Sequence, residues 1–513
     1  MKGKKVLIVG AGPGGLTAGM ILASYGYDVN IFEKNSYVGG RTGFIKQDGY
    51  TFDIGPTFLM MDFQLKEMFS LAGKAVEDYM TLKRVDPMYR LQYKDNKVLK
   101  LYNDQKLMEA QMESLFPGSY PWYLNFLKNE EIKFAKVFPS LKVSYSNLTD
   151  MLRKELRAAI PYLDAHKNLF SHLGNYFAND DFKIAFTFQA KYLGMSPWEC
   201  PGTFSIISFI EHRLGIFHVL GGLNEICQGI AKACRDLAGK ITLNTAVKEI
   251  IVKNGRAVGL ELENGEVLEG DHVIINADFA YAMDNLVPEA NKKKYTSEKM
   301  RKKKYSCSIF MMYLGVDKQY PLEHHNIYFS DDYKKNITEI THGNKVPEDP
   351  SFYIQNAVVT DSSVAPPGKA ALYVLVPVSN NFSGIDWTVN EEPFREKILT
   401  LLEQKAGLTD IRSHIETEKI ITPKTWEEEY NVYSGATFNL AHNIGQMLYF
   451  RPHNKFEEFD NCYLVGGGTH PGSGLPTILE SARISSSLIL EKDNVSLTHF
   501  NDHSNLDVMG KPL

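Results

Sequence analysis

The chain opens with an apolar run from Val6 to Val9, followed by a glycine-rich turn and small residues over 14–25. A second strand pattern covers 28–32. An unbroken apolar run is typical of a strand in the centre of a parallel sheet, and small residues suit a helix packed closely on it. The start of the chain therefore predicts a strand, a helix and a second strand.

Later segments alternate between helical and strand patterns. Residues 105–135 and 147–193 have a helical pattern, and a helix ends near Gly239. A meander follows, because two Asn-Gly pairs, a strong hairpin signal, separate short alternating runs. The expected strands are 241–245, 248–252, 258–262, 266–269, 272–278, 305–316 and 370–378, and the expected late helices are 390–406 and 475–490.

The strand pattern of the first sheet stops after the opening segments and resumes twice later in the chain. This predicts interleaved domains in an α/β fold. We expect a discontinuous Rossmann-like dinucleotide-binding domain from 1–84, 216–289 and 436–492. A substrate domain, with a mixed sheet and helices, would comprise 85–215 and 290–435. Residues 493–513 would form a flexible tail.

Bulk properties exclude several classes. A net charge of −5 argues against a nucleic-acid binder, and the five scattered cysteines predict buried thiols rather than disulfides. His324-His325 is too short to form a site and no other histidine has metal-ligand spacing, so we expect no metal. With no signal segment before the first strand and no apolar run long enough to span a bilayer, we expect a cytoplasmic protein with at most peripheral membrane contact. A lysine-rich segment, 292–304, is either solvated or in contact with anionic lipid.

The first glycine turn fits the pattern G-x-G-x-x-G between a strand and a helix. Gly10 permits a tight turn, Gly12 admits a pyrophosphate, and Gly15 brings the helix close to the strand. Glu33 ends the second strand, where its carboxylate suits a ribose hydroxyl and repels a 2′-phosphate. These features predict a dinucleotide other than NADP.

Three further turns favour FAD over NAD. They are Gly39-Gly40-Arg41, Gly55-Pro56 and the glycine-rich loop 465–476 near the end of the chain, which would reach the redox ring. The expected cofactor-binding residues are Gly10, Gly12, Pro13, Gly14, Gly15, Glu33, Lys34, Gly40, Arg41, Gly55, Pro56, Val247, Asp278, Gly467, Thr469, Gly474, Leu475 and Pro476.

These motifs resemble a known family. The segment from Gly10 to Arg41 is similar to the FAD-binding opening shared by amine oxidases, protoporphyrinogen oxidases and carotenoid desaturases. The closing segment 461–476, with 360–366, 386–388 and 450–454, resembles bacterial and fungal phytoene desaturases, a family that includes dehydrosqualene desaturases. Residues 305–308 and 329–332 look like the dehydrosqualene branch, while the other motifs suit both branches, so the substrate's chain length stays open.

The resemblance implies FAD as the redox cofactor, a long apolar polyprenoid drawn from the bilayer, and a quinone or oxygen as electron acceptor. It also places a catalytic acid and base at Asp150 and Arg153, although Asn147 and Asp150 equally fit a helix cap and the Asp150–Arg153 pair a surface ion pair. His470 would either contact the flavin or bond to backbone groups in a crowded turn.

Other functions are possible on a fold of this kind. A carotenoid oxidase, an isomerase or a later-step desaturase would share the scaffold. A prenyl-binding chaperone like the GDP dissociation inhibitors keeps the fold without flavin, but the intact cofactor motifs argue against it. A covalent-flavin amine oxidase is disfavoured because the closing loop lacks a cysteine.

Overall fold

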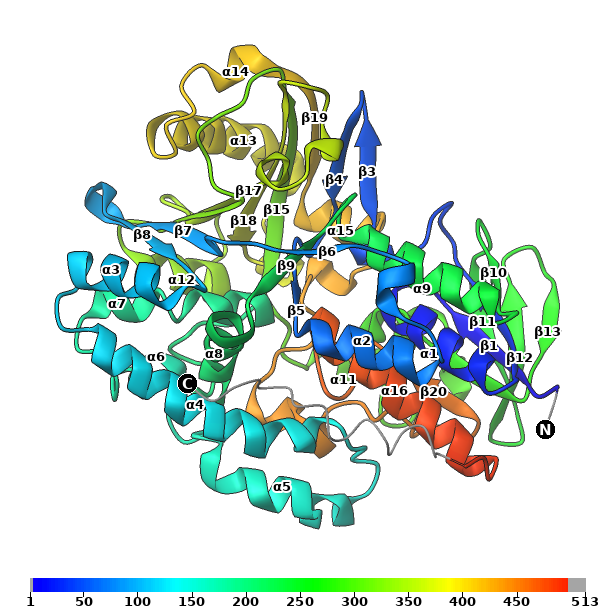
Figure 1. The fold of residues 1–513 in the computed structure, drawn as a ribbon. Coiled ribbons are helices and arrows are strands. Elements are labelled where there is room, and N and C mark those ends of the chain that lie inside the picture. Colours follow the sequence, from blue (N-terminus) through cyan, green and yellow to red (C-terminus); the bar gives the residue numbers. More distant parts are fainter. Residues whose placement is uncertain (1–2, 497–513) are drawn as a thin grey trace.

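The computed structural model describes residues 3–496, which build two main sheets with a helical layer (Figure 1). The first sheet is fully parallel and combines strands from the first and last parts of the described chain. Its strands, in spatial order, are β10 (Lys240–Thr242), β2 (Asp28–Phe32), β1 (Lys5–Val9), β14 (His272–Ile275) and β20 (Cys462–Leu464). The predicted opening strand, helix and strand are confirmed.

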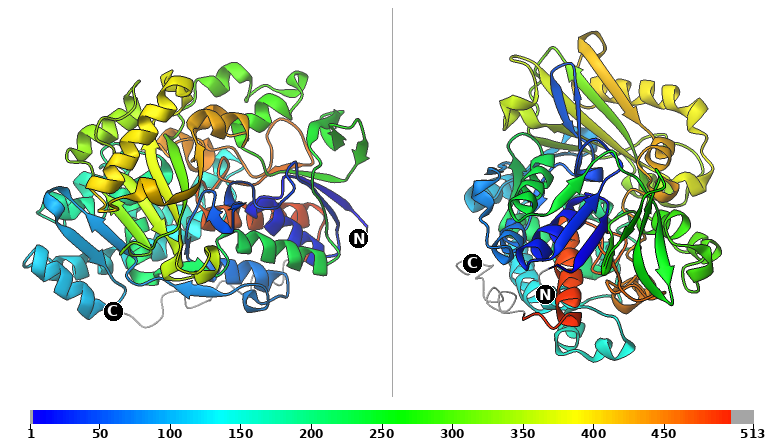
Figure 2. Two further views of the ribbon diagram at one scale, coloured as in Figure 1. Left: turned by 90° about the horizontal axis from the view of Figure 1, so that it is seen from above. Right: turned by 90° about the vertical axis from the view of Figure 1, so that its right-hand side faces the viewer.

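The two faces of this sheet are covered differently. Val6 and Ile8 point to a core shared with three helices, whereas Leu7 and Val9 face a small meander. The helices are α1 (Pro13–Ser24), α9 (Asn224–Asp236) and α16 (Leu475–Lys492), and the meander strands are β11 (Val247–Lys253), β12 (Arg256–Leu262) and β13 (Val267–Glu269). Both predicted hairpins are confirmed. Figures 1 and 2 show α16 beside α1, so the last helix packs on the first.

The second sheet has seven strands and mixed pairing. Their order is β19 (Ile415–Ile421), β15 (Ser308–Val316), β18 (Ala370–Val378), β17 (Phe352–Asn356), β16 (His325–Tyr328), β7 (Tyr89–Gln92) and β8 (Val98–Leu101). One face packs on helix α13 (Trp387–Gln404) with α14 (Ile411–His414), and the other on the hairpin β3 (Phe44–Gln47) and β4 (Tyr50–Asp53). Only β15 and β18 correspond to predicted strands.

A helical layer rich in phenylalanine covers the end of the second sheet that carries β7 and β8 (Figure 1). It comprises α3 (Gln105–Leu115), α4 (Tyr120–Leu141), α5 (Lys154–Ala159), α6 (Leu169–Leu173), α7 (Asp180–Ile184) and α8 (Ser205–Leu214). Residues 147–193 form several short helices rather than long ones. A small antiparallel sheet, β5 (Leu59–Met60), β9 (Ile216–Val219) and β6 (Leu82–Arg84), links this layer to the first sheet. The remaining α-helices are α2 (Asp62–Leu71), α10 (Phe279–Asn285), α11 (Ser297–Arg301), α12 (Tyr333–His342) and α15 (Pro423–Glu428).

Asp493, the first residue of the predicted tail, is anchored to the first sheet. Asp493 is buried and accepts hydrogen bonds from Lys4 Nζ at 2.5 Å and from the Tyr27 hydroxyl at 2.9 Å. The predicted tail therefore does not begin at residue 493, because this carboxylate ties the end of α16 to the first sheet. Residues 497–513 lie outside the described part of the chain, and the other domain boundaries stay predictions.

Two side-chain expectations can be compared with the structure. The five cysteines are free and buried, as predicted. Several lysines of the segment 292–304 form ion pairs with acidic neighbours, among them Lys292 with Glu289 and Lys302 with Glu298. Within residues 3–496, no helix combines the length and apolar character needed to cross a bilayer.

Candidate functional site

The first glycine turn joins β1 to α1 in a close-packed cradle. Gly10 has a φ of +91°, and a Cβ atom there would lie 2.4 Å from the Asn276 carbonyl oxygen. A Cβ at Gly15 would lie 2.3 Å from the Gly10 oxygen. No side chain of the described residues caps the first turn of α1, so its amide groups are available to an anion. The turn therefore has the shape and polarity expected for a pyrophosphate.

Glu33 lies beside this turn, as predicted. Its carboxylate accepts hydrogen bonds from the Ala11 N–H at 2.8 Å and from the Asn35 N–H at 3.0 Å, which fix its orientation. Val247 begins β11, close to the Thr245 N–H that donates to the Glu33 carbonyl. The Lys34 ammonium donates to the Glu429 carbonyl at 2.9 Å, and its predicted contact with the cofactor stays a prediction.

Arg41 connects the second glycine turn to the end of the chain. The Gly39 N–H donates to the Ala11 carbonyl at 2.8 Å, which joins the two turns. The Arg41 guanidinium donates to the Thr437 carbonyl at 2.9 Å and to Asn439 Oδ1 at 3.2 Å. These contacts place Arg41 between the start of the chain and segment 436–440.

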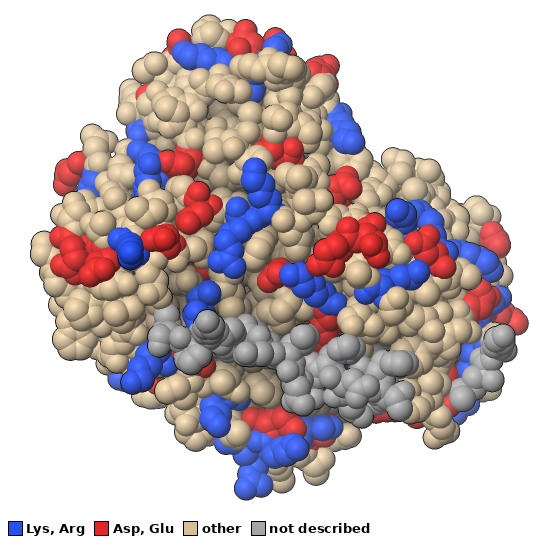
Figure 3. Space-filling model, in the orientation of Figure 1, with Lys and Arg blue, Asp and Glu red and all other residues tan. Residues whose placement is uncertain are grey.

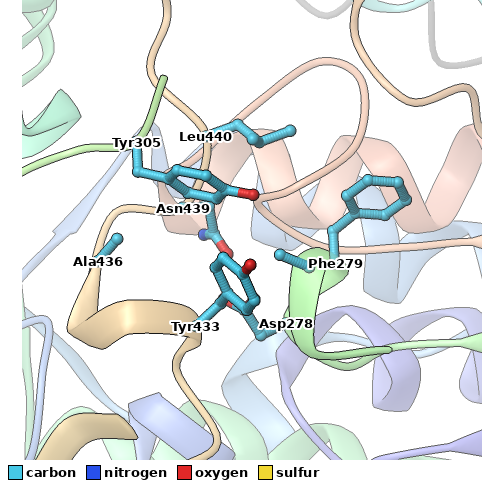
Figure 4. Close-up of a pocket in the computed structure, with 8 residues that line it drawn as sticks. Asp278, Phe279, Tyr305, Tyr433, Ala436, Asn439 and Leu440 are labelled. Atoms are coloured by element: carbon cyan, nitrogen blue, oxygen red, sulfur yellow. The ribbon is translucent and has the colours of Figure 1, made fainter. Parts of the chain in front are cut away.

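Asp278 completes this region. It caps α10, and its carboxylate lies 3.7 Å from the Arg41 guanidinium. Burial raises the pKa of Asp278, while Arg41 opposes that shift. Asp278 also lines a small pocket with residues of two other segments (Figure 4). The other lining residues are Phe279, Ala280, Tyr305, Tyr433, Ala436, Asn439 and Leu440.

The Gly55-Pro56 turn is held by tyrosines of the second sheet. Tyr373 donates its hydroxyl to the Gly55 carbonyl at 2.6 Å, and Tyr313 donates to the Ile54 carbonyl at the same distance. A Cβ atom at Gly55 would lie 2.6 Å from the Arg41 carbonyl oxygen. The turn therefore packs on the Arg41 turn and joins the second sheet to the cofactor cradle.

The closing loop 465–476 meets the first glycine turn. A Cβ atom at Gly14 would lie 2.5 Å from Val465 Cγ1, so the two loops are in contact as predicted. Gly474 has a φ of +114° and precedes Leu475 and Pro476 at the start of α16. The Thr469 hydroxyl donates to the Pro452 carbonyl at 2.6 Å.

His470 is a buried residue of the closing loop. Its ring meets the ring of Tyr145 edge-on, with centroids 5.0 Å apart. Burial lowers the pKa of His470 to about 3, so the imidazole is neutral at physiological pH. Its described ring contact is with the segment that follows α4.

Asp150 and Arg153 form a local structure at the surface. Asp150 accepts the Asn147 N–H at 2.8 Å in a capping box, and the Arg153 guanidinium lies 3.0 Å from the same carboxylate. These contacts are the helix cap and ion pair that the spacing allowed. A catalytic role for the two residues stays a prediction.

Several supporting residues were not identified from the sequence. Arg451 is fully buried and donates to backbone carbonyls of the closing loop, including Thr469 and Gly467. Asn276 holds the first turn through its amide, which donates to the Gly10 carbonyl at 3.0 Å. For Arg451, the only indication in the sequence is its position in the segment 450–454, which resembles the desaturases. The resemblance assigns no role to Arg451.

A buried carboxyl lies in the helical layer next to the second sheet. Glu211 of α8 accepts hydrogen bonds from the Tyr89 hydroxyl and from Gln189 Nε2, both at 2.8 Å. Burial raises its pKa from 4.5 to about 7, although these hydrogen bonds oppose the shift. Glu211 is therefore largely neutral in mildly acidic solution and loses its proton near neutral pH.

This titration predicts a pH-dependent stability. Below pH 4.5 the Glu211 carboxyl is neutral in both the folded and the unfolded protein. As the pH rises towards 7, the carboxyl loses its proton in the unfolded chain but keeps it in the folded protein. The free energy of unfolding therefore falls over this pH range. Glu211→Gln removes this effect, and we expect its stability relative to wild type to rise by about 2–3 kcal/mol between pH 4.5 and pH 8. Urea unfolding at both pH values tests this, with the exposed Glu491→Gln as control. Parallel pH curves for wild type and Glu211→Gln would contradict it.

Comparisons with known proteins agree with this geometry. Residues 13–490 match the family model described as flavin containing amine oxidoreductase. The chain is 50% identical to a 4,4′-diapophytoene desaturase (4,4′-diapolycopene-forming) of a Methylomonas species, over 96% of each chain. It is 37% identical to a zeta-carotene-forming phytoene desaturase of Myxococcus xanthus, over 94% of this chain and 93% of that one. An oxidoreductase structure from Methanosarcina mazei aligns with a TM-score of 0.62 at 18% identity, over 95% of this chain and 100% of that one, which shows the fold.

Proposed function

Because the chain belongs to the flavin-containing amine oxidoreductase family, we propose that it is an FAD-dependent desaturase of a linear carotenoid precursor. The observation that carries this proposal is the 50% identity to a 4,4′-diapophytoene desaturase over almost the whole of both chains. The same similarity favours 4,4′-diapophytoene (dehydrosqualene) over the longer phytoene. An oxidase, an isomerase or a non-catalytic prenyl-binding chaperone is less well supported, since the named relatives are desaturases and the cofactor cradle is intact.

The cofactor is FAD, and the residues of the cradle fit it. The uncapped end of α1 and the glycine turn would hold the pyrophosphate, Glu33 a ribose, and Arg41 the part nearer the redox ring. When bound, FAD accepts a hydride from the substrate. The protein's own tasks are to place an allylic carbon against the ring, to exclude water and to remove a proton.

We retain Asp150 and Arg153 as candidates for the acid and base, on the strength of the resemblance alone. The electron acceptor is proposed to be a quinone or oxygen, because each turnover leaves reduced flavin that has to be reoxidised.

The substrate is apolar, so contact with a membrane surface is also proposed. A set of exposed apolar side chains on neighbouring short helices supports it; we call it the apolar patch, and it comprises Leu148, Leu152, Ile160, Ile444 and Phe450. Arg153, Lys154 and Arg157 are exposed beside it. Figure 3 shows basic side chains at the lower edge of the molecule, where α5 lies. Apolar side chains flanked by basic ones suit an anionic lipid surface.

The patch can be tested by adding charge. The double variant Leu148→Glu and Leu152→Glu places two carboxylates where leucine side chains would enter the lipid. Burial of each leucine side chain contributes about 1.5–3 kcal/mol to binding, and this contribution is lost in the variant. We expect vesicles with anionic lipid to bind the double variant at least ~10-fold more weakly. Val389→Glu, at an equally exposed valine on α13, is the matched control. Equal co-sedimentation of all three proteins would contradict the proposed surface.

The desaturase activity is tested by product analysis. FAD-loaded protein is incubated with 4,4′-diapophytoene or with phytoene in liposomes, and the extracts are separated by chromatography. Coloured, more conjugated products support the proposal, and the faster-converted precursor identifies the chain length. Unchanged precursor in both reactions, with FAD bound and an acceptor present, would refute it.

A further inference from the structure

The buried carboxyl of Glu211 is joined to two tyrosine hydroxyls by hydrogen bonds. Glu211 lies on α8, Tyr89 on β7, and Tyr192 in the 3₁₀ helix Phe188–Leu193. The Tyr89 hydroxyl donates to Glu211 Oε1 at 2.8 Å, and the Tyr192 hydroxyl oxygen lies 3.1 Å from that of Tyr89. The hydrogen bonds therefore run without a break from Tyr192 to Glu211, and we call these three residues the tyrosine–glutamate network.

The ionised carboxylate sets the direction of these hydrogen bonds. A carboxylate only accepts, so the Tyr89 hydroxyl directs its proton at Glu211 and accepts the hydroxyl proton of Tyr192. Gln189 Nε2 donates to the second oxygen, Glu211 Oε2, at 2.8 Å and so fixes the carboxylate. Within residues 3–496, no side chain or backbone group donates to the Tyr192 oxygen. That oxygen is therefore free to accept a proton from a ligand.

The two ends of the network differ in exposure. Glu211 and Tyr89 are fully buried, whereas Tyr192 is partly exposed. The Tyr192 ring packs on the ring of Phe58, with centroids 5.7 Å apart, and Phe58 is also partly exposed. The hydroxyl of Tyr192 therefore belongs to the accessible end of the network, and the carboxyl to the buried end.

The accessible end lies next to a turn that is predicted to bind the cofactor. Phe58 follows the Gly55-Pro56 turn by two residues, and the Thr57 hydroxyl between them lies 2.9 Å from the hydroxyl of Tyr353. Tyr353 is partly exposed although β17 is an interior strand of the second sheet. Partly exposed aromatic side chains thus surround this turn, on the side where an apolar substrate would have to approach the cofactor.

The electrostatic surroundings leave Glu211 as the titrating group of this region. Burial raises its pKa to about 7. Burial also lowers the pKa of His212, the next residue of α8, to about 3, and holds that of His325, which packs on Tyr89, well below its ordinary value. Lys191, next to Tyr192, places its ammonium over the Tyr333 ring. A pKa near the working pH is the value expected of a base.

A purely structural role for the carboxyl fits less well. Ionisation of a buried carboxyl costs stability, and none of the ion pairs within residues 3–496 involves Glu211. A neutral side chain of the same size would avoid this cost. Buried groups with strongly shifted pKa values that weaken a core are expected at functional sites.

We propose that Glu211 is the base of the desaturation reaction and receives the substrate proton through the hydroxyls of Tyr192 and Tyr89. This inference rests on the proposed desaturase function. In each step two C–H bonds of the substrate break. One hydrogen leaves with its electron pair as a hydride to FAD. The other leaves as a proton, and the electrons of its bond form the new C=C bond.

The proton moves along the hydrogen bonds of the network. The Tyr192 oxygen takes it from the substrate, the hydroxyl proton of Tyr192 passes to Tyr89, and that of Tyr89 passes to Glu211. Both hydroxyls are then intact and the carboxyl is neutral. When the product has left, the same steps in reverse return the proton to water at Tyr192. A C–H bond next to an allylic cation is strongly acidic, so a hydroxyl backed by a carboxylate is sufficient.

In this scheme Tyr192 touches the substrate, and Tyr89 and Glu211 act through it. Asp150 would then not be the proton acceptor, because its carboxylate is engaged by the Asn147 N–H and the Arg153 guanidinium in the helix cap.

The test follows flavin bleaching by 4,4′-diapophytoene in liposomes without oxygen, together with the absorbance of the conjugated product. FAD-loaded full-length protein is used, with Glu211→Gln, Tyr192→Phe or Tyr89→Phe, and with Asp150→Asn for comparison. We expect the wild-type rate to rise with pH with a midpoint of about 7. Glu211→Gln should react roughly 100-fold more slowly and lose this pH dependence, with KM and FAD content unchanged. Both tyrosine variants should be slowed as well, because each interrupts the path of the proton.

Two matched controls are available outside the network. The Tyr79 hydroxyl donates to the Asp236 carboxylate at 2.8 Å, the distance found between Tyr89 and Glu211, so Tyr79→Phe removes an equivalent hydrogen bond elsewhere. Glu491→Gln removes an exposed carboxyl of α16. Both controls should keep the wild-type rate and pH profile.

A wild-type rate and pH profile in Glu211→Gln would overturn the inference, and so would a loss of rate confined to Asp150→Asn. If Glu211→Gln loses FAD, Tyr192→Phe decides, because it removes one oxygen atom from a partly exposed side chain; a normal rate in this variant would make the network structural. If the wild-type protein converts neither precursor, the desaturase function itself fails. That result is distinct from wild-type activity with unaffected variants.

Discussion

Replacing Arg451 by methionine is expected to lower the free energy of unfolding by about 3–5 kcal/mol and to release FAD. Methionine has a similar length but no donors. The Arg451 guanidinium donates to the carbonyls of Gly467 at 2.6 Å and Thr469 at 3.0 Å in the closing loop. It also donates to those of Gln446 and Leu440. Buried carbonyls that lose their donors keep the full cost of their removal from water.

The effect should be larger than that of an ordinary core substitution, because one side chain holds three separate segments. Burial lowers the pKa of Arg451 to about 9, so it remains mostly charged at neutral pH. Urea unfolding and the flavin content after desalting measure the two effects. Arg256→Met, at an exposed arginine of β12, is the control. Near-wild-type stability with full FAD content would show that the closing loop does not depend on this side chain.

The elements around the first sheet could be predicted because each is specified by a short stretch of sequence. The strand, turn and helix around Gly10, the acid at Glu33 and the two Asn-Gly hairpins each combine a local backbone requirement with an apolar pattern. The proximity of the two glycine loops was also expected, because both suit one extended cofactor, and Gly14 and Val465 are where they meet.

The second sheet and its contacts were less accessible to sequence reasoning. The parallel pairing of β7 with β16 joins segments more than two hundred residues apart, and neither has a long alternating pattern. The Lys34 ammonium bonds to the Glu429 carbonyl, a contact between distant segments that the sequence did not indicate, and its predicted role at the cofactor stays a prediction.

The structure also shows how the two halves of the molecule are coupled. Tyr313 and Tyr373, on adjacent strands of the second sheet, donate to the Ile54 and Gly55 carbonyls of a cofactor turn. Side chains of the second sheet therefore fix the backbone of the Gly55-Pro56 turn, one of the turns predicted to bind the cofactor.

Replacing Gly15 by alanine is expected to weaken FAD binding about 100-fold. An added Cβ atom would lie 2.3 Å from the Gly10 carbonyl oxygen and 2.8 Å from Asn276 Nδ2, so the turn has to open. Forced overpacking of this kind costs about 1–3 kcal/mol, and the upper end corresponds to a 100-fold change in the dissociation constant. Alanine is the better helix former, so local helix propensity would act in the opposite direction.

The measurement is FAD affinity by quenching of flavin fluorescence, together with flavin retained after desalting. Gly445→Ala is the matched control, because the nearest atom to its added Cβ is 3.7 Å away, an ordinary contact. If Gly15→Ala retains a full complement of FAD with unchanged affinity, the close approach of strand and helix is not what shapes the pyrophosphate site. Weakened binding in Gly15→Ala alone, with an unchanged unfolding transition, would assign the effect to the cradle rather than to the fold.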